Sequence, residues 1–358
     1  MTGVKLGVNV RFKNPPRFAR DWAQVYREHL EYAAAADRLG FDAVWVPEHH
    51  GVPSGYNPTP LMILAAIAQV TKKVSFGIQP LILPFHNPVL AAEQIAVLDV
   101  LSGGRVIMGV GIGFLRHDFL MLGKDRTKRG AMMDEALAIL TRALWDETPF
   151  DFEGRFYSHR EINLTPRPLQ KKVELQLAIR SEAAAKRVAQ HEINVNLQGF
   201  PTAARIGPVV AEIAAKAGRD PGNVGAGVQR TGFILESEQR ARDRAFEFVV
   251  EDGKEYDRFM ATSSDPPDRE LIAIREALRK ESPSSAEIFP GAYSAQALID
   301  AIHSDIEGLK KAGLRPDWIN LSLWPPGLPL ADALECLERV ANEVLPHVPR
   351  AKTAACAR

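Results

Sequence analysis

Three adjacent polar residues, Glu48, His49 and His50, follow the apolar run Ala43–Val46. Pro47 stands between them, and a proline cannot donate a hydrogen bond to a continuing sheet. The pattern predicts a buried strand that ends in groups able to do chemistry. Imidazole exchanges protons readily near neutral pH, so a histidine in this place is suited to act as a general acid or base. We predict that His49 and its acidic neighbour Glu48 are catalytic.

Two other interpretations of this triplet are open. Paired histidines also occur as structural residues whose rings bond to nearby backbone. Because side chains alternate along an extended segment, His49 is expected to point away from Glu48 and His50, so that one histidine serves the site while the other holds the loop. The second alternative is a metal site formed by Glu48 and one histidine, but no other acidic or histidine cluster completes it. We therefore expect no metal.

Two further candidates lie in predicted strands. Gln79 and Pro80 fall within an apolar run, where a bulge or a cis bond would turn the backbone toward the end of the strand. An ordinary trans proline is the alternative. Gly111 closes a Gly-Val-Gly segment that lacks the G-x-G-x-x-G spacing, so it supports a nicotinamide site only weakly. Glycines at a strand end instead allow a flat ring, or another backbone, to approach closely.

Arg180 and Ser181 mark the junction between a predicted strand and a helix. Ser181 can cap that helix, and the backbone N–H groups of its first turn, together with the positive end of the helix dipole, can accept a phosphate. A serine cap without any ligand is the more common arrangement. The junction is therefore a candidate anion site that needs support from elsewhere in the chain.

These candidates require a scaffold that brings strand ends together. Apolar runs alternate with helical patterns, which is the repeating unit of a parallel sheet whose catalytic groups follow the C-terminal ends of the strands. The pattern predicts an α/β fold, a (β/α)8 TIM barrel; an open doubly wound sheet is the alternative, but no pair of mononucleotide-binding halves is visible. The predicted strands are 4–11, 43–46, 74–83, 105–111, 174–179, 193–197, 224–235 and 317–324.

Two regions depart from this alternation. Residues 150–172 are rich in turn formers and are predicted to form a hairpin-like insertion. Residues 237–285 are polar and mostly helical, and we expect a lid region near 252–290 within and after them. The remaining pattern predicts one domain over residues 1–350, with residues 351–358 as a flexible C-terminal tail.

Composition narrows the classes of function. The chain has 44 basic and 44 acidic residues without a basic stripe, which gives no electrostatic support for binding nucleic acid or acidic membranes. Its two cysteines do not form a disulfide framework, and no apolar run approaches the roughly 20 residues that span a bilayer. The start of the chain enters a strand directly, without the pattern of a signal peptide. We expect a soluble, cytoplasmic protein.

With these residues in view, the chain resembles the bacterial luciferase-like flavin-dependent monooxygenases, which are (β/α)8 barrels. The resemblance covers nearly the whole chain, and its specificity comes from the order and spacing of short segments. These segments are 44–50 (VWVPEHH), 81–84 (LILP), 87–93 (NPVLAAE), 98–105 (LDVLSGGR), 109–111 (GVG), 129–130 (RG), 134–137 (DEAL) and 166–168 (PRP).

The resemblance implies a flavin-dependent monooxygenase that uses reduced FMN and oxygen to oxygenate a small organic substrate. His49 matches the active-site histidine beside the flavin, and Gln79-Pro80 falls where the family often has an unusual cis bond behind the flavin ring. Ser181, with the backbone of Glu182, matches the turn that binds the flavin phosphate. Residues 261–269 match a mobile lid.

Departures from the family pattern are informative. In light-emitting members a reactive cysteine and an arginine follow the fourth strand, where this chain has Gly111 and Ile112. Ala184 replaces a further hydroxyl contact to the phosphate, so phosphate binding relies more on backbone and on Arg180. These differences argue against light emission with a long-chain aldehyde.

Partners and alternatives follow from the same resemblance. The chain shows no nicotinamide-binding domain, so we expect a separate flavin reductase to supply reduced FMN, or reduced nicotinamide to bind transiently over the flavin. A homodimer formed through the second and third barrel units is also expected. The alternatives are a deazaflavin-dependent oxidoreductase, which transfers hydride without oxygen, and a non-catalytic flavin-binding protein.

Overall fold

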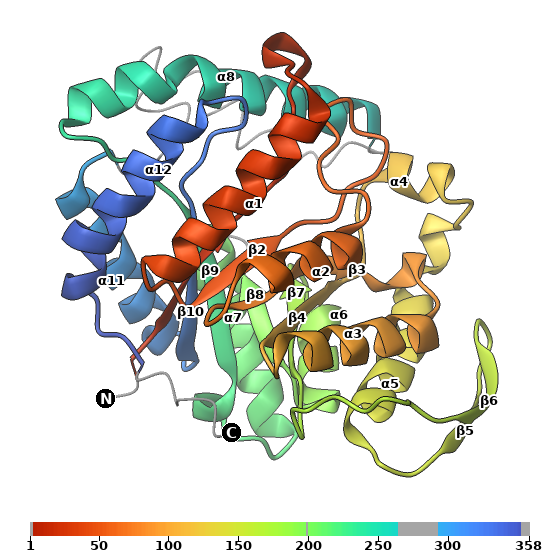
Figure 1. Cartoon of the computed structure of the whole chain (residues 1–358). Coiled ribbons are helices and arrows are strands. Elements are labelled where there is room, and N and C mark those ends of the chain that lie inside the picture. Colours follow the sequence, from red (N-terminus) through yellow and green to blue (C-terminus); the bar gives the residue numbers. More distant parts are fainter. Residues whose placement is uncertain (1–2, 198–199, 264–292, 352–358) are drawn as a thin grey trace.

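Eight parallel strands form a closed ring in the computed structural model, which describes residues 3–197, 200–263 and 293–351. Strand β1 pairs with both β2 and β10, so the ring has no open edge (Figure 1). The (β/α)8 barrel predicted from the sequence is confirmed, and the open doubly wound sheet is excluded. In spatial order the strands are β1 (Lys5–Asn9), β2 (Ala43–Val46), β3 (Ser75–Ile82), β4 (Val106–Gly111), β7 (Glu174–Ile179), β8 (Asn194–Leu197), β9 (Gly225–Thr231) and β10 (Arg315–Ser322).

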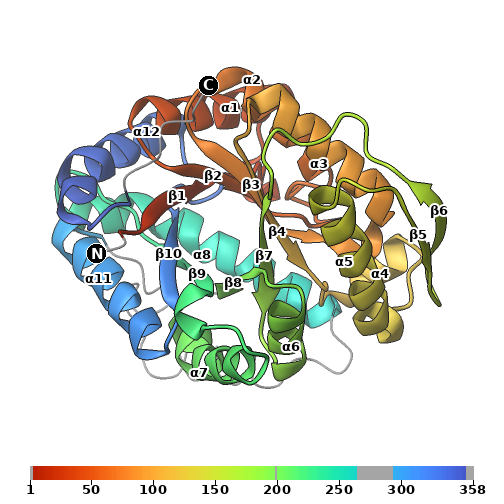
Figure 2. The same ribbon diagram turned by 90° about the horizontal axis from the view of Figure 1, so that it is seen from below.

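Helices surround this ring, as the view along the barrel shows (Figure 2). Capping residues set where these helices begin and end, as α3 illustrates. The Asn87 side chain accepts the N–H of Val89 at the start of that helix, and Gly103, at φ +71°, ends it. The outer helices are α1 (Trp22–Arg38), α2 (Pro60–Val70), α3 (Pro88–Ser102), α5 (Arg129–Trp145), α6 (Glu182–Gln190), α7 (Phe200–Lys216), α11 (Ala295–Lys311) and α12 (Leu330–Arg339).

The strands are mostly apolar because both of their faces are buried, although a few buried polar side chains such as Gln176, Asn196 and Asn320 lie among them. Their outward side chains join the large core between the sheet and the helices. Inside the ring, Trp45 and Trp318 meet edge to face with 5.7 Å between ring centroids, in a small separate cluster with Ala43 and Ile107. The interior is therefore packed with side chains below the level at which the strands end.

The largest differences from the prediction concern two strands and one helix. The run 224–235 is strand only as far as Thr231, and its buried remainder is apolar because it packs in the core. The last strand begins at Arg315, which lies opposite Gly225, and is thus shifted toward the N-terminus from the predicted 317–324. A short helix that the sequence pattern did not indicate, α4 (Arg116–Met121), follows β4.

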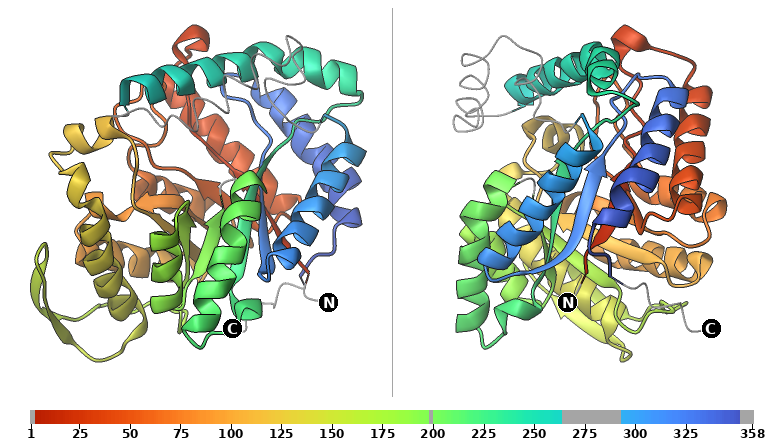
Figure 3. Two further views of the ribbon diagram at one scale, coloured as in Figure 1. Left: turned by 180° about the vertical axis from the view of Figure 1, so that it is seen from behind. Right: turned by 90° about the vertical axis from the view of Figure 1, so that its left-hand side faces the viewer.

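The predicted insertion is an antiparallel hairpin. Strands β5 (Phe150–Glu153) and β6 (Ser158–Ile162) pair with each other and project away from the barrel (Figure 3). The carboxylate of Glu135 on α5 accepts the backbone N–H groups of residues 155, 156 and 157 at 2.9–3.1 Å. This single side chain ties the tip of the hairpin to the barrel.

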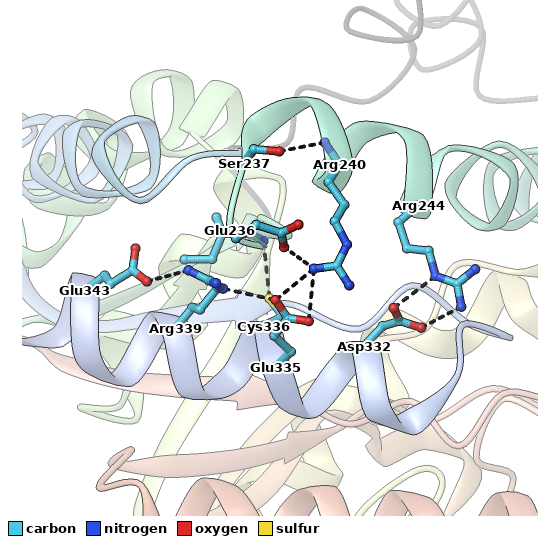
Figure 4. Close-up of polar contacts among 10 residues, drawn as sticks. Glu236, Ser237, Arg240, Arg244, Asp332, Glu335, Cys336, Arg339 and Glu343 are labelled. Carbon is cyan, nitrogen blue, oxygen red and sulfur yellow. Dashed lines mark hydrogen bonds and ion pairs between the residues drawn. The ribbon is translucent and has the colours of Figure 1, made fainter.

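A long helix, α8 (Glu238–Ser263), lies across the C-terminal end of the barrel (Figure 1, Figure 3). Arg240 and Arg244 of α8 reach the carboxylates of Glu335 and Asp332 on α12, at 3.2 and 2.9 Å (Figure 4). Residues 252–263 of the predicted lid region 252–290 belong to this helix, whereas residues 264–290 lie outside the described residues. Of the predicted tail, residues 352–358 lie outside them as well.

Within the described residues, the helices are each too short or too polar to cross a bilayer.

Candidate active site

Glu48 lies at the centre of a buried polar cluster just beyond β2. One carboxylate oxygen is 2.7 Å from Nε2 of His86 and 3.1 Å from Nε2 of His50, and the other accepts the backbone N–H of Ile82. The side chain is 1% exposed. Burial alone would raise the pKa of this carboxyl, but the hydrogen bonds from His50, His86 and Ile82 lower it to about 2. Glu48 is therefore an ionised anchor between β2 and the end of β3.

A second carboxyl group, Asp118 of α4, borders the same cluster. Its side chain is buried, and burial raises its pKa to about 6 in spite of the opposing effects of His50. One of its oxygens, Oδ1, lacks a hydrogen-bond partner among the described residues. Asp118 and Glu48 thus titrate in widely separated pH ranges although both are near His50. Sequence reasoning missed Asp118 because it lies in the unpredicted helix α4.

His49 points away from this cluster. Its ring packs against Tyr56, with 4.4 Å between ring centroids and 32° between planes, whereas Glu48 and His50 contact each other. Burial, followed by the positive charge of Lys13, lowers the pKa of His49 to about 3. The imidazole is therefore neutral at pH 7.

Gln79 and Pro80 sit at a break in the pairing of β3 with β4. The register shifts between Ile78 and Leu81, and the Gln79–Pro80 peptide bond is cis. A Cβ placed on Gly111 would lie 2.7 Å from Cγ of Pro80. The glycine thus lets the bulged segment approach β4, which is one of the two explanations that the sequence pattern left open.

Ser181 caps α6 immediately after β7. Its hydroxyl accepts the N–H of Ala184 at 3.4 Å, and the backbone of Glu182 begins the helix. The side chain of Glu182 turns away to pair with Lys186 at 3.0 Å. Arg180, Ser181 and Glu182 are all exposed, so the first-turn N–H groups are accessible to an anion.

Two further arginines are linked to Arg180, Arg126 through Phe114 and Arg129 through Arg126. The Arg180 guanidinium lies 5.0 Å from the ring of Phe114, and Arg126 donates from Nε to the carbonyl of the same Phe114 at 3.1 Å. Arg129, at the start of α5, has its pKa lowered by burial and by Arg126, and its Nε is buried without a hydrogen-bond partner in the described part of the chain. Three like charges close together favour an anionic ligand.

Sequence reasoning assigned no role to Arg126 and Arg129. They lie more than fifty positions before Ser181, and no local pattern links a loop before α5 to the start of α6. The signal that could have found them is the family segment at Arg129-Gly130, which was used only as a mark of resemblance.

The barrel interior offers polar groups for the ring of a ligand. Asn320 donates from Nδ2 to Oε1 of Gln79 at 3.1 Å, which leaves Nε2 of Gln79 and Oδ1 of Asn320 without partners in the described structure. Nδ2 of Asn196 is also buried without a hydrogen-bond partner among the described residues. Buried amide groups of this kind are normally satisfied by water or by a ligand. Together with the arginines around Ser181, they fit a planar heterocycle that carries a phosphate.

All these groups follow, or end, strands that run parallel in one closed ring. His49 follows β2, Gln79 lies near the end of β3, Gly111 ends β4, and Ser181 follows β7, with β3 and β4 between β2 and β7. The candidate histidine and the candidate anion site are therefore on the same rim of the barrel. Residues 3–197, 200–263 and 293–351 contain no group of three or more His, Cys, Asp or Glu side chains placed to hold a metal ion.

The family of this chain follows from its match to the luciferase-like monooxygenases over residues 4–290. Because the match covers most of the sequence, the chain belongs to this family of oxidoreductases.

Three relatives show the range of activities in proteins similar to this chain. Limonene 1,2-monooxygenase of Rhodococcus erythropolis is 40% identical over 121 residues, which are 34% of this chain and 31% of that protein. The oxygenase component of flavin-dependent trigonelline monooxygenase of Acinetobacter baylyi is 30% identical over 41% of each chain. An F420-dependent glucose-6-phosphate dehydrogenase of Amycolatopsis mediterranei is 33% identical over 40% of this chain and 45% of its own. The chain thus matches less than half of the length of each relative.

Two solved structures share the fold at low sequence identity. Monooxygenase RslO1 from Streptomyces bottropensis has a TM-score of 0.79 at 22% identity, over 96% of this chain and 99% of its own. The oxygenating constituent of 3,6-diketocamphane monooxygenase from Pseudomonas putida, a type II Baeyer-Villiger enzyme in complex with FMN, has a TM-score of 0.76 at 19% identity, over 98% of this chain and 100% of its own. At this level of identity the likeness concerns the fold.

Proposed function

We propose that this protein is a flavin-dependent monooxygenase that uses reduced FMN and oxygen to oxygenate a small organic substrate. The observation that carries the proposal is the placing of the neutral imidazole of His49 and the arginine-lined start of α6 on one rim of the barrel. Sequence relatives named as monooxygenases support it. The bound flavin would supply the electrons and the atom at which oxygen reacts.

Each candidate residue has a distinct task in this proposal. Arg129 and the first-turn N–H groups after Ser181 hold the phosphate, and Gly111 lets the bulged Gln79-Pro80 segment pack closely against β4, where that segment lines the place of the flat ring. His49 accepts a proton beside the ring. Glu48 is a positioning residue, because its buried carboxylate holds His50, His86 and the end of β3 in place.

A deazaflavin-dependent oxidoreductase is the second candidate. Relatives in the sequence comparison include an F420-dependent dehydrogenase, and a deazaflavin also carries a phosphate and a heterocycle with polar edges. The intact triplet of Glu48, His49 and His50 favours FMN in our proposal. A non-catalytic flavin-binding protein is the third candidate, and the presence of His49 argues against it.

We also propose a separate flavin reductase and a homodimer. Two of the similar proteins are described as an oxygenase component and an oxygenating constituent, which implies that another component reduces their flavin. For the dimer, support comes from large apolar side chains that are exposed on both helices. They are Met62 and Val70 on α2, and Leu90, Val97 and Leu101 on α3, which recur at intervals of one or two helical turns.

Oxygen consumption with defined cofactors tests this proposal. The purified protein is mixed with chemically reduced FMN or reduced deazaflavin, and oxygen uptake is followed with a panel of terpenes, ketones and N-heteroaromatic compounds. We expect product-coupled uptake with FMN and at least one substrate. Tight binding of deazaflavin with hydride transfer and no oxygen uptake would establish the second candidate, and tight flavin binding without any turnover would establish the third. NADH-dependent turnover by the chain alone, without added flavin, would contradict the need for a separate reductase.

A further inference from the structure

The segment that follows β1 has a strained backbone beside the candidate catalytic histidine. Phe12 has a φ of +50°, which is rare for a bulky residue and costs conformational energy. Its ring is fully buried and stacks on His29, with 5.0 Å between centroids, and also contacts Tyr26. This packing holds the strained conformation in place and fixes the direction of the next residue, Lys13.

Lys13 is a buried cation with two carboxylate partners on another element. Its side chain is 2% exposed, and its Nζ lies 2.5 Å from Asp252 and 2.7 Å from Glu255, both on α8. Arg11 binds the other oxygen of Asp252 at 2.7 Å. Burial by itself would lower the pKa of Lys13, but the nearby carboxylates of Asp252 and Glu255 raise it above the ordinary value, so the ammonium stays charged at neutral pH. A cation this deeply buried needs such partners, and their cost suggests a role beyond stability.

The ammonium of Lys13 also faces the catalytic candidate through one aromatic ring. Its Nζ lies 4.6 Å from the centroid of Tyr56, and that ring lies 4.4 Å from the centroid of the His49 imidazole. A desolvated cation over an aromatic face is attracted to the electron-rich face of the ring. The carboxylates of α8, Lys13, Tyr56 and His49 thus form one continuous series of contacts.

We propose that Lys13 is a positioning residue for His49: its ammonium, fixed by Asp252 and Glu255 of α8, holds the Tyr56 ring against the imidazole. The role deepens the proposed function, since an uncharged imidazole is the form that accepts a proton beside the cofactor. A like charge nearby disfavours protonation, and the aromatic ring limits the orientations of the histidine.

Charged groups from three directions face His49. Lys13 comes from the segment after β1 and opposes protonation, as does His50 when it is charged. Glu48, on its own segment, favours protonation. From α8, Asp252 and Glu255 act on His49 through Lys13, and they would favour protonation of the imidazole if Lys13 were lost. Removing the ammonium therefore raises the pKa of His49 in two ways. A repelling charge is lost, and the carboxylates of Asp252 and Glu255 are left without their cation.

The titration of His49 in the flavin-free protein tests this role independently of turnover. Long-range nitrogen NMR of histidine-labelled full-length protein follows the imidazole signals from about pH 4 to about pH 8, and His49→Gln identifies the signal of His49. We expect the wild-type ring to stay neutral over most of this range, and its titration midpoint to rise in Lys13→Met. Lys13→Arg should restore the wild-type titration.

A matched control separates this local effect from the general anchoring of α8. Arg17 lies on the same stretch of chain and pairs with Glu247 and Glu251 of α8 at 3.9 and 3.5 Å, but its side chain is 51% exposed. Arg17→Gln should leave both the titration of His49 and the turnover as in the wild type. A change in Arg17→Gln as large as that in Lys13→Met would overturn the proposal, because anchoring of α8 would then explain both.

Turnover provides the second measurement. With substrate and reduced FMN, Lys13→Met should lower kcat at neutral pH by about tenfold while KM changes little, because the Tyr56 ring no longer fixes the orientation of the imidazole and substrate binding is unaffected. If Lys13→Met does not fold, Tyr56→Leu removes the ring and leaves the ion pairs intact, and it should lower kcat in the same way.

An unchanged NMR titration and kcat in the folded variants would refute the role of Lys13. An altered titration in a protein without any turnover would leave Lys13 as the neighbour that sets the charge of His49 and would count against the proposed function instead.

Discussion

The ring of Pro80 occupies the space that a side chain at Gly111 would need. The distance from an ideal Cβ on Gly111 to Cγ of Pro80 is 2.7 Å, and to Cβ of Pro80 it is 2.9 Å. The two residues lie on adjacent strands, at the point where the pairing of β3 and β4 is irregular. Gly111 also stands where light-emitting members of the family, by the resemblance, have a reactive cysteine. The bulge and a side chain at position 111 therefore exclude each other in this structure.

Gly111→Ala should destabilise the protein by about 1 to 3 kcal/mol, because the added methyl group must displace a backbone-anchored ring. Urea unfolding measures the change. Gly130→Ala is the control: a Cβ there meets its nearest neighbour at 3.6 Å, in a helix where alanine is preferred over glycine. An equal stability of Gly111→Ala and the wild type would show that Pro80 moves aside freely.

Glu48→Gln should lower the free energy of unfolding by on the order of 3 kcal/mol at neutral pH, since a buried ionised group loses its charge while its partners remain. The folded-state pKa of about 2 lies below the ordinary value of 4.5, so the stabilisation is complete above about pH 4.5 and declines as the pH falls toward 2. Unfolding measured at several pH values should show the wild type and the variant converging in acid. A constant difference between them would contradict the depressed pKa.

His49→Ala should lose turnover by on the order of a hundredfold or more while retaining the cofactor, if His49 transfers a proton. Flavin fluorescence gives the binding constant, and single-turnover oxygen uptake gives the rate. Unchanged turnover would remove His49 from the mechanism. A parallel loss of flavin binding would assign the histidine to the cofactor site instead.

Arg129→Gln should weaken the binding of FMN by roughly tenfold to a hundredfold, the range expected for a hydrogen bond between charged groups. Riboflavin, which has no phosphate, should bind the variant and the wild type equally. Arg142→Gln, on the same helix but paired with Asp146 at the surface, should leave both affinities unchanged. Equal losses for FMN and riboflavin would place Arg129 away from the phosphate.

Val97→Glu together with Leu101→Glu should yield a monomer, because two charges in an apolar contact between copies are costly to bury. Sedimentation velocity at several concentrations measures the association. Leu169→Glu changes an apolar side chain that is similarly exposed, at 61% against 53% for Leu101, but lies outside α2 and α3. It should behave as the wild type, which we expect to be a dimer. A monomeric wild type would refute the proposed assembly directly.

The parts of the structure that were predictable from sequence are those set by local patterns. The apolar run before Pro47, the turn-rich insertion around Gly154 and the serine cap at Ser181 each depend on neighbours a few positions away, and all three elements appear in the structure. The closed barrel was predictable from the alternation of strands and helices along the chain. The end of β9 at Thr231 was misplaced because burial in the core makes loop residues as apolar as strand residues, whereas the start of β10 was missed because Arg315 and Pro316 are not typical of a strand.

The contacts that shape the site were not predictable in this way. Glu48 is joined to His86, Lys13 to Asp252, and Asp118 lies near His50, and each pair is separated by tens to hundreds of positions. Hydrophobic periodicity carries no information about such pairs. Lys13 has no motif around it, and its role becomes visible only when α8 is seen across the end of the barrel.

The pairing of β1 with β10 has a consequence for how the chain is made. Residues 5–8 of β1 pair with residues 318–321 of β10, a strand that is synthesised more than 300 residues later. Just before β1, the backbone N–H of Val4 bonds to the carbonyl of Pro349 at 2.8 Å, which lies later still in the chain. During translation, the first strand therefore emerges from the ribosome with one side of its backbone unpaired, and it stays so until the final unit arrives. Newly made chains that stop before Arg315 would expose that strand to association with one another, which makes chaperone protection valuable until synthesis has passed that residue.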